Sequence, residues 1–257
     1  MPEHNATSQN CSSDLQSSLV SVSIVNHGHD EMVGSLIGDL AALSGTRLEI
    51  ILTQNIPEVR RSFSTAIPFH TVLIDNAKPK GFGANHNAAF ARAKGDFFCV
   101  LNPDIRIARN PFPALLAELS WPNVGVAAPR IVDPSGGIED SARRFPTVAF
   151  LARKALGGAR VVDYDAVEEP ISPDWIAGMF MVFRKEAFAA VGGFDENYFL
   201  YYEDVDICRR LRSRGFDIRM VPSVEAIHDA RRQSRRSLRH MRWHLASMVR
   251  YFLGSMK

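Results

Sequence analysis

The chain has 257 residues, of which 46% are apolar and 23% charged, and its formal net charge is +2. These proportions are those of an ordinary folded protein, so they exclude an extended disordered chain and give no support to nucleic-acid binding. The three cysteines are scattered without a CxxC pair, which excludes a disulfide framework and a cysteine zinc site. No signal-peptide pattern and no apolar run of about 20 residues occur, so we expect a cytoplasmic protein with at most a surface contact to a membrane.

The N-terminal half alternates between strand-like and helix-like patterns. Residues 1–18 are polar and rich in serine, asparagine and glutamine, which predicts a disordered tail. Strands are then expected at 19–25, 48–52, 71–74 and 96–101, and helices at 30–44, with Asp30 as the N-cap, and at 84–93. This alternation predicts an α/β fold with a mostly parallel central sheet covered on both faces.

The C-terminal half has a less regular pattern and ends in a basic segment. Strands are expected at 124–128, 131–132, 175–183 and 218–221, and helices at 185–191 and 203–214. Between Arg231 and Arg250 there are seven arginines and two histidines, without any aspartate or glutamate. Residues 231–257 are therefore predicted to form a basic amphipathic helix with an apolar stripe of Leu238, Met241, Leu245, Met248, Val249 and Phe252. Two alternatives fit this stripe: it packs on the domain, or it lies on an anionic membrane.

Polar residues follow the predicted strands of the first half, at Asn26, at Asn55 and at Asn102. Since the carboxyl ends of parallel strands meet at one edge of a sheet, we expect these side chains to converge on one crevice. The loop 81–87 enters the same crevice, and its glycines would let backbone amides approach an anion at the start of a helix. An ordinary glycine turn is the alternative, and His86 at the sixth position argues against a dinucleotide fingerprint.

Two candidate metal ligands follow predicted strands. Asp104 closes the apolar run that ends in Asn-Pro-Asp, and His228 follows the strand 218–221 in a later loop. A hard divalent cation needs a carboxylate and can accept a histidine. The alternative for Asp104 is a turn residue, and a single histidine is more commonly structural.

A cluster of carboxylates opens the helix predicted at 203–214. Glu203, Asp204 and Asp206 follow an aromatic run at 198–202. The helix dipole alone favours carboxylates at this position, so helix stabilisation is one interpretation. The other is a catalytic site, because aromatic neighbours can form a wall for a sugar and raise the pKa of a carboxyl group by desolvation.

Together these segments resemble the inverting glycosyltransferases of family 2, which have the GT-A fold, in their rhamnosyltransferase-like branch. The resemblance covers about residues 20–252 and is carried by 22–26, 81–87, 97–104, 174–188, 192–214 and His228. It implies a GT-A domain at 19–230 with a Rossmann-like nucleotide-binding half, preceded by the tail 1–18 and followed by the helix 231–257.

The resemblance also implies roles for the candidate residues. Asp204 matches the catalytic base of an ED-type pair, with Glu203 beside it. Asp104 matches the last carboxylate of the DxD-type metal motif, Asn102 stands at the first position of that motif, and His228 matches the metal-binding histidine. The implied cofactor is Mg²⁺ or Mn²⁺.

The donor implied by the resemblance is a nucleoside-diphosphate sugar. Its contacts are expected from Asn26, Asn55, Gly81, Gly83, Asn85, Asn102, Trp175 and Gly178. Asn55 stands where many relatives have an aspartate that contacts the base, and the first strand ends in Asn-His-Gly instead of an aromatic residue and Asn. The nucleotide is therefore left open between dTDP and UDP.

The expected reaction moves a sugar, L-rhamnose by resemblance, to a glycan or lipid-linked glycan in surface polysaccharide synthesis. Asp204 would accept the proton of the attacking hydroxyl, and one displacement would invert the anomeric centre. Two other classes stay open: a nucleotidyltransferase acting on a sugar phosphate, and a non-catalytic protein that binds nucleic acid or membrane through its basic helix. The first lacks an early glycine-rich motif with a following Lys or Arg.

Overall fold

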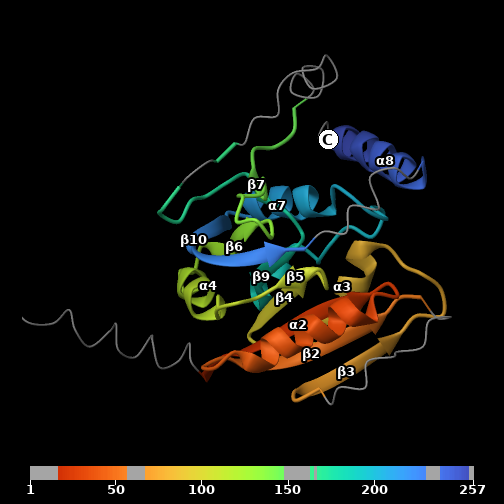
Figure 1. Cartoon of the computed structure of the whole chain (residues 1–257). Helices are drawn as coiled ribbons and strands as arrows, with labels where there is room; N and C mark the ends of the chain where they lie inside the picture. The colour runs from red at the N-terminus through yellow and green to blue at the C-terminus, as the bar shows by residue number, and fades with distance from the viewer. Residues whose placement is uncertain (1–16, 57–66, 148–162, 165–166, 230–237, 255–257) are drawn as a thin grey trace, which may run out of the picture.

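A computed structural model describes residues 17–56, 67–147, 163–164, 167–229 and 238–254. Most of the predicted tail 1–18, and Cys11 in it, lie outside these residues. Among them, eight strands form one sheet in the order β3-β2-β1-β4-β9-β6-β10-β5 (Figure 1). The strands are β1 (Leu19–Asn26), β2 (Arg47–Gln54), β3 (His70–Asp75), β4 (Phe97–Leu101), β5 (Ile105–Arg106), β6 (Val124–Val132), β9 (Phe180–Arg184) and β10 (Asp217–His228).

The sheet is mostly parallel, as predicted. Strands β3, β2, β1 and β4 run parallel to one another, and β10 runs parallel to β6. Strand β9 is antiparallel to both β4 and β6 and joins the two halves, while β5 is antiparallel to β10. A second, two-stranded sheet consists of β7 (Ala142–Arg143) and β8 (Trp175–Ile176).

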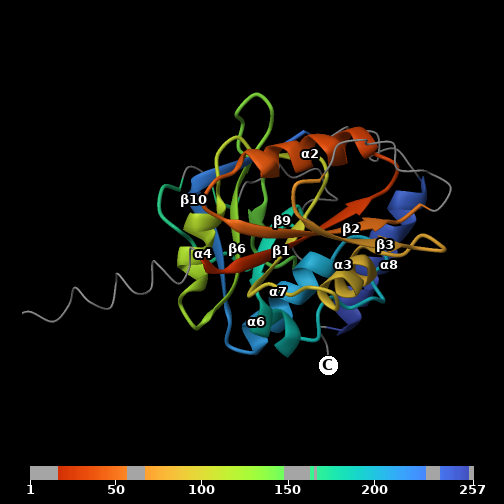
Figure 2. The same ribbon diagram turned by 90° about the horizontal axis from the view of Figure 1, so that it is seen from below.

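Helices cover both faces of the sheet, and alternating strand residues divide the core in two. Val20, Val22 and Ile24 of β1 face α2 (Asp30–Ala42) and α4 (Phe112–Leu119). Phe98 and Val100 of β4 face the other layer. That layer holds α3 (Phe82–Phe90), α6 (Lys185–Ala190), α7 (Glu203–Ser213) and α8 (Leu238–Gly254), with α2 on the opposite side in Figure 2. Cys99 and Cys208 are free and buried.

Four local predictions need correction. Strand β10 continues past Val221 to His228, because pairing with β6 resumes after an irregularity that contains Pro222. The predicted strand 175–183 is broken between β8 and β9, since its first part pairs with β7. Helix α4 was not predicted. Asp30 is the first helical residue instead of the cap, which is His29.

Helix α8 packs on the domain with a different face from the predicted one. Ser247 and Tyr251 are buried, and Met248 and Phe252 pack against the core. The rest of the predicted stripe is exposed, namely Leu238, Met241, Leu245 and Val249. Of the two alternatives for this stripe, the one in which all of it packs on the domain is therefore wrong. The aromatic contacts of α8 with residues 199–202 fix its rotation instead. Within the described parts of the chain, no helix combines the length and apolar character needed to cross a bilayer.

Candidate active site

A turn with unusual backbone geometry leads into α7. Among the described non-glycine residues, Tyr201 and Tyr202 are the ones with positive φ, at 72° and 68°. Side chains other than glycine adopt this region at a cost, and such residues concentrate at functional sites. Tyr202 is buried, and its carbonyl accepts the amide hydrogen bond of Asp206 at 2.9 Å. The surrounding packing therefore fixes the position at which the carboxylates of α7 begin.

Asp204 is held by backbone amides and stays partly exposed. Its Oδ2 accepts a hydrogen bond from the Gly178 amide at 3.1 Å, and its Oδ1 accepts one from Val205 at 2.9 Å. Desolvation raises the pKa of Asp204, while the amides of Gly178 and Val205 and the charge of Arg143 oppose this shift. No ion pair joins Asp204 to a side chain in the part of the chain that the structure describes, and a carboxylate of raised pKa that backbone amides orient suits a general base.

The other two carboxylates of the cluster differ from Asp204. Glu203 is 5% exposed, and its Oε2 has no hydrogen-bond partner within the described part of the chain. Burial raises the pKa of Glu203 well above its usual range, and the charge of Asp204 adds to this, which favours the neutral acid.

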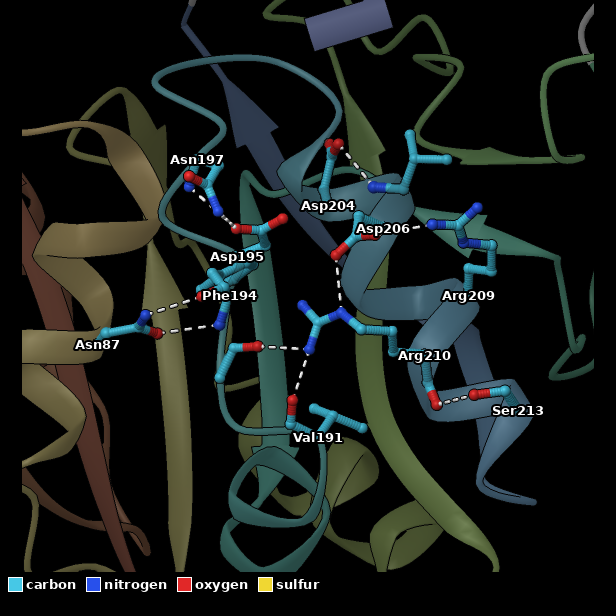
Figure 3. Close-up of polar contacts among 12 residues, drawn as sticks. Asn87, Val191, Phe194, Asp195, Asn197, Asp204, Asp206, Arg209, Arg210 and Ser213 are labelled. Carbon is cyan, nitrogen blue, oxygen red and sulfur yellow. Dashed lines mark hydrogen bonds and ion pairs between the residues drawn. The ribbon is translucent and has the colours of Figure 1, made fainter. Parts of the chain in front are cut away.

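Asp206 is an anchor for the helix. Its carboxylate binds Arg209 at 3.1 Å and Arg210 at 2.7 Å. Arg210 in turn donates to the carbonyls of Val191 and Gly193, so this carboxylate ties α7 to the preceding turn. Figure 3 shows Asp206 directed toward the arginines, whereas Asp204 is directed away from them. The helix-stabilising interpretation therefore fits Asp206, and the catalytic one fits Asp204.

The two candidate metal ligands are neighbours. His228 Nε2 lies 3.3 Å from Asp104 Oδ2, at the point where β10 ends and pairs with β5. The other ring nitrogen, Nδ1, lies 2.8 Å from Glu139 Oε2, which fixes the orientation of the ring. Burial alone would lower the pKa of His228, but its hydrogen bonds to Asp104 and Glu139 raise it to about 9.

The Asp104 carboxylate has an unused acceptor. Its Oδ1 is buried and has no hydrogen-bond partner among the described residues. A buried acceptor without a partner is costly unless a ligand completes the site. The described ranges contain no group of three or more His, Cys, Asp and Glu side chains that could hold a metal by itself. Asp104 and His228 are thus neighbouring candidate ligands, and a cation held by them would take its other ligands from a substrate.

One short segment joins the two candidate groups. The amide of Gly178 donates to Asp204, and the carbonyl of the next residue, Met179, accepts a hydrogen bond from Asn102 at 2.9 Å. A Cβ at position 178 would lie 3.1 Å from Phe82 and 3.6 Å from the Asp204 Cβ, so there is little room for a side chain here. Gly178 therefore sets the position of Asp204 relative to the strand end that carries Asn102 and Asp104.

The asparagines of the N-terminal half form a buried polar network. Asn55 is fully buried; its Oδ1 accepts from the Lys80 amide and from Asn76, and its Nδ2 donates to the Lys80 carbonyl. Asn85 is buried in the same way, accepting from Asn76 and donating to Gly81. These hydrogen bonds hold the loop before α3. A contact between Asn55 and a nucleotide base stays a prediction, and it would require Asn55 to give up one of these hydrogen bonds.

Asn26, Gly81 and Gly83 also have structural partners. Asn26 is fully buried and donates to Asp30 and Gln54. A Cβ at Gly81 would lie 2.7 Å from the Phe199 carbonyl oxygen, and one at Gly83 would lie 2.7 Å from the Phe194 Cβ. Close packing of α3 on residues 194–199 therefore explains both glycines, and their contact with a phosphate stays a prediction.

Comparison with known proteins decides the family. A family model described as "Glycosyltransferase like family 2" matches residues 18–246. The chain belongs to glycosyltransferase family 2. Membership decides against the nucleotidyltransferase and the non-catalytic protein that the sequence left open.

Two relatives show where this glycosyltransferase lies within the family. A rhamnosyltransferase of Escherichia coli K12, WbbL, is 30% identical over 91% of this chain and 92% of its own. An N-acetylglucosaminyl-diphospho-decaprenol L-rhamnosyltransferase of Mycobacterium tuberculosis is 36% identical over 52% of this chain and 47% of its own. These similarities support the rhamnosyltransferase-like branch.

Solved structures support the GT-A fold. GalNAc-T7, crystallised with UDP, GalNAc and Mn²⁺, superposes with a TM-score of 0.62 at 17% identity over 82% of this chain and 44% of its own. A mannosyltransferase of Pyrobaculum calidifontis, in complex with GDP-Man and Mn²⁺, gives 0.60 at 16% identity over 90% and 64%. The fold predicted from the sequence is thereby confirmed.

The structure adds residues to the site of this glycosyltransferase that sequence analysis did not assign. The guanidinium of Arg143 lies 5.3 Å from the centre of the Trp175 ring and is held by Asp140 at 2.7 Å. Its positive charge opposes the desolvation that raises the pKa of Asp204. The only sequence signal was an arginine pair in an irregular segment. Trp175 itself is buried and donates to the Arg144 carbonyl, and its contact with a sugar stays a prediction.

His86 is a second residue whose place only the structure shows. It is buried in α3, its Nδ1 lies 2.8 Å from Ser23 Oγ, and its Nε2 has no partner among the described residues. Burial lowers the pKa of His86 to about 3, and His27 contributes, so the ring is neutral. His27 in turn contacts Asn55 at 3.2 Å. His27 therefore belongs to the asparagine network, whereas His86 is bonded to Ser23 of β1.

Proposed function

We propose that this glycosyltransferase moves one sugar, with L-rhamnose as the first candidate, from a nucleoside diphosphate to a hydroxyl of a glycan or lipid-linked glycan. The sugar is suggested by WbbL, to which the chain is similar over 91% of its length. A lipid-linked acceptor is suggested by the mycobacterial relative, whose name specifies N-acetylglucosaminyl-diphospho-decaprenol. The observation that carries the chemistry is the partly exposed Asp204, held by two backbone amides at the entrance of α7.

In the proposed reaction Asp204 acts as the general base. The acceptor hydroxyl gives its proton to the Asp204 carboxylate while its oxygen attacks the anomeric carbon. The bond between that carbon and the diphosphate oxygen breaks, and the nucleoside diphosphate leaves with the electron pair. A single displacement inverts the anomeric configuration and needs no enzyme nucleophile. The raised pKa of Asp204 makes the carboxylate a stronger proton acceptor than an ordinary aspartate.

Asp104 and His228 would hold the divalent cation, Mg²⁺ or Mn²⁺. The fit rests on the unpartnered Asp104 Oδ1 and on Glu139, which orients His228 through the nitrogen opposite Asp104. When bound, the cation neutralises the charge that develops on the departing diphosphate. Asn102, two residues before Asp104, is partly exposed at the same strand end.

The nucleotide, dTDP or UDP, is expected at the carboxyl ends of β1 and β2. In open parallel sheets, ligands bind beyond these ends. Asn26 ends β1, and His27 and Asn55 directly follow β1 and β2. Gly81 and Asn85 lie in the loop and helix that follow β3, and they are joined to Asn55 by hydrogen bonds through Lys80 and Asn76. The hydrogen bonds among these residues support a preformed nucleotide site, in which the asparagines hold the backbone groups of the loop in position.

A donor panel tests this proposal. The wild-type enzyme is incubated with dTDP-L-rhamnose or with UDP-sugars, with Mn²⁺ or with EDTA, and with an N-acetylglucosaminyl-diphospho-polyprenol acceptor. We expect acceptor-dependent release of nucleoside diphosphate that is strongest with dTDP-L-rhamnose and is lost with EDTA. Release that EDTA leaves unchanged would remove the cation from the proposal. Pyrophosphate formed from a nucleoside triphosphate and a sugar phosphate, without glycosyl transfer, would overturn it.

A further inference from the structure

Helix α8 presents a second apolar face that nothing in the described chain covers. Its outward side chains are each at least half exposed: Leu238 74%, Met241 55%, Leu245 50%, Val249 53% and Leu253 57%. We call these five residues the outer stripe. They repeat every three or four positions and so form one continuous band along the helix. Single exposed apolar side chains are common, but a contiguous band marks a surface that meets a partner.

The outer stripe is exposed although α8 is firmly packed on the domain. On the opposite face Tyr251 is 4% exposed, and Ser247 Oγ donates to the Leu200 carbonyl at 2.9 Å. The His244 ring lies 5.5 Å from the Tyr202 ring. With 3.6 residues per turn, Leu245 and Val249 point roughly 120–160° away from Ser247 and Tyr251. The outer stripe therefore cannot turn inward without loss of these contacts.

The charge around the outer stripe specifies the kind of partner. Residues 238–254 contain three arginines and no aspartate or glutamate. By helical spacing Arg242 lies within the stripe, and Arg239 and Arg250 lie along one flank. Four more arginines precede the helix in the sequence, between positions 231 and 236. Asp195 and Asp206 line the hollow beside Leu245 and Val249, but Asp206 is paired with Arg209 and Arg210. A helix whose charged side chains are all positive and flank bulky apolar residues fits the interface of an anionic bilayer.

A second copy of the chain fits this surface less well. Two-fold pairing of α8 with its copy would bring the same patch of both chains into one contact. The arginines of both helices would then gather at that contact, with no carboxylate on either helix to compensate them.

The position of α8 gives this surface a use. The Trp243 ring lies 4.6 Å from the Phe199 ring, and His240 Nδ1 lies 2.9 Å from Tyr201 Oη. Residues 199–202 lead directly into Glu203 and Asp204. Figure 1 shows α8 at the edge of the molecule, on the side where this segment enters α7. A helix on the membrane surface would thus hold the catalytic turn close to a lipid-linked substrate.

We propose that the outer stripe and its arginines form a docking surface for anionic membrane, which places the acceptor side of the active site at the bilayer. The use of this surface rests on the proposed lipid-linked acceptor, but its binding to lipid does not. Apolar side chains would enter the headgroup region while the arginines contact lipid phosphates.

Vesicle co-sedimentation of the full-length protein tests the proposal. Vesicles of phosphatidylcholine with and without phosphatidylglycerol are compared at low and high salt. We expect binding that requires the anionic lipid and weakens with salt. Leu245→Glu or Val249→Glu should lower partitioning about tenfold or more, because each removes an apolar contact and adds a repelled charge. Leu73→Glu is the matched control, since Leu73 is also 50% exposed but lies on the edge strand β3.

The contribution of charge has its own matched pair. Arg242→Gln should lower partitioning about fivefold, whereas Arg109→Gln, an exposed arginine far along the chain from α8, should leave it unchanged. Thermal melts establish that each variant is folded, and either stripe variant suffices if the other unfolds. Wild-type protein that ignores phosphatidylglycerol vesicles, or folded stripe variants that bind like wild type, would overturn the proposal.

Two further results separate this proposal from its competitors. A wild-type dimer without lipid that Leu245→Glu converts to monomer would make the outer stripe an interface between copies and overturn membrane docking. Asp204→Asn should bind vesicles like wild type while losing turnover, and Leu245→Glu should retain turnover on a detergent-solubilised acceptor. Failure of vesicle binding with intact transfer would refute the docking surface alone; intact vesicle binding without any transfer would refute the proposed function alone.

Discussion

The two halves of the active site use their polar side chains in different ways. In the N-terminal half Asn55 and Asn85 are fully buried, and both bond to neighbouring side chains and to the backbone of the loop 80–81. In the second half, formed by the loop after β4 and the start of α7, Asp104 and Glu203 each have a buried oxygen without a partner among the described residues, and Asp204 is partly exposed. The asparagines of the first half are therefore bonded within a rigid scaffold, and the second half has carboxylates available for a ligand.

This difference shows that residue type alone does not distinguish a ligand contact from a scaffold. Both halves place amides or carboxylates just beyond the carboxyl ends of strands. What separates them is whether the hydrogen-bonding capacity of each side chain is already used within the fold. The comparison predicts that substitutions in the second half change the chemistry, whereas substitutions in the first half change stability.

The largest effect is expected for Asp204→Asn. Loss of the base should lower kcat about 10²- to 10⁴-fold, while donor binding and the melting temperature stay near the wild-type values. Steady-state kinetics and calorimetry with the donor measure the two effects. Glu203→Gln is the matched control, because burial already favours the neutral form of Glu203, and it should lose far less. An Asp204→Asn enzyme with wild-type turnover would refute the base assignment.

A smaller effect is expected at the cation site. Asp104→Asn should weaken Mn²⁺-dependent donor binding by more than Glu139→Gln, which should cost roughly 10- to 100-fold because it only loosens the orientation of His228. Calorimetry with nucleoside diphosphate and Mn²⁺, compared with EDTA, gives both values. If wild type and Asp104→Asn bind the nucleoside diphosphate equally well in the presence of Mn²⁺, Asp104 is not a ligand of the cation.

In the N-terminal half, Asn55→Ala is expected to act on stability. It leaves the Lys80 backbone and Asn76 without their partner, so the free energy of unfolding should fall by about 1–3 kcal/mol. Asn197→Ala, at an exposed position bonded to Asp195, should change it by less than about 0.5 kcal/mol. Urea unfolding measures both. A large rise in donor KM at unchanged stability would make Asn55 a nucleotide contact and break the comparison between the halves.

The smallest effect concerns pH. Desolvation raises the pKa of Asp204, so kcat should reach its full value above that pKa and fall as the pH drops through it. The midpoint of this fall should lie above about 4, the ordinary pKa of an aspartate. The charge of Arg143 opposes this shift, so Arg143→Gln should move the acidic limb of the profile to higher pH. Profiles of kcat at saturating donor and metal test this. An Arg143→Gln profile displaced to lower pH would contradict it.

Much of the fold was predictable because its signals are local. Apolar runs such as 97–101 specify buried strands, and the carboxylate-rich start of α7 specifies a helix. The continuation of β10 to His228 was not predictable, since pairing with β6 across a bulge is a tertiary interaction. The same holds for the break between β8 and β9 at Gly178, because the hydrogen bond from the Gly178 amide to Asp204 is also a tertiary interaction.

The candidate site was predictable as a set of residues but not as a division of roles. The motif residues Asp104 and His228 do come together, although they are far apart in sequence. That Asn26, Asn55 and Asn85 are bonded within the fold depends on partners from other elements, which no spacing reveals. The same limit explains α8, whose apolar stripe showed amphipathicity but not which face the domain would bury.

The central claim is that one displacement, assisted by Asp204, moves the sugar. The anomeric configuration of the product tests it most directly. Proton and carbon NMR of the glycoside formed from dTDP-L-rhamnose gives this configuration, with the donor spectrum as reference. The account predicts the opposite configuration at the anomeric carbon. A product that retains the donor configuration would require a second displacement or an enzyme nucleophile, and would contradict the role of Asp204 as a general base in a single step.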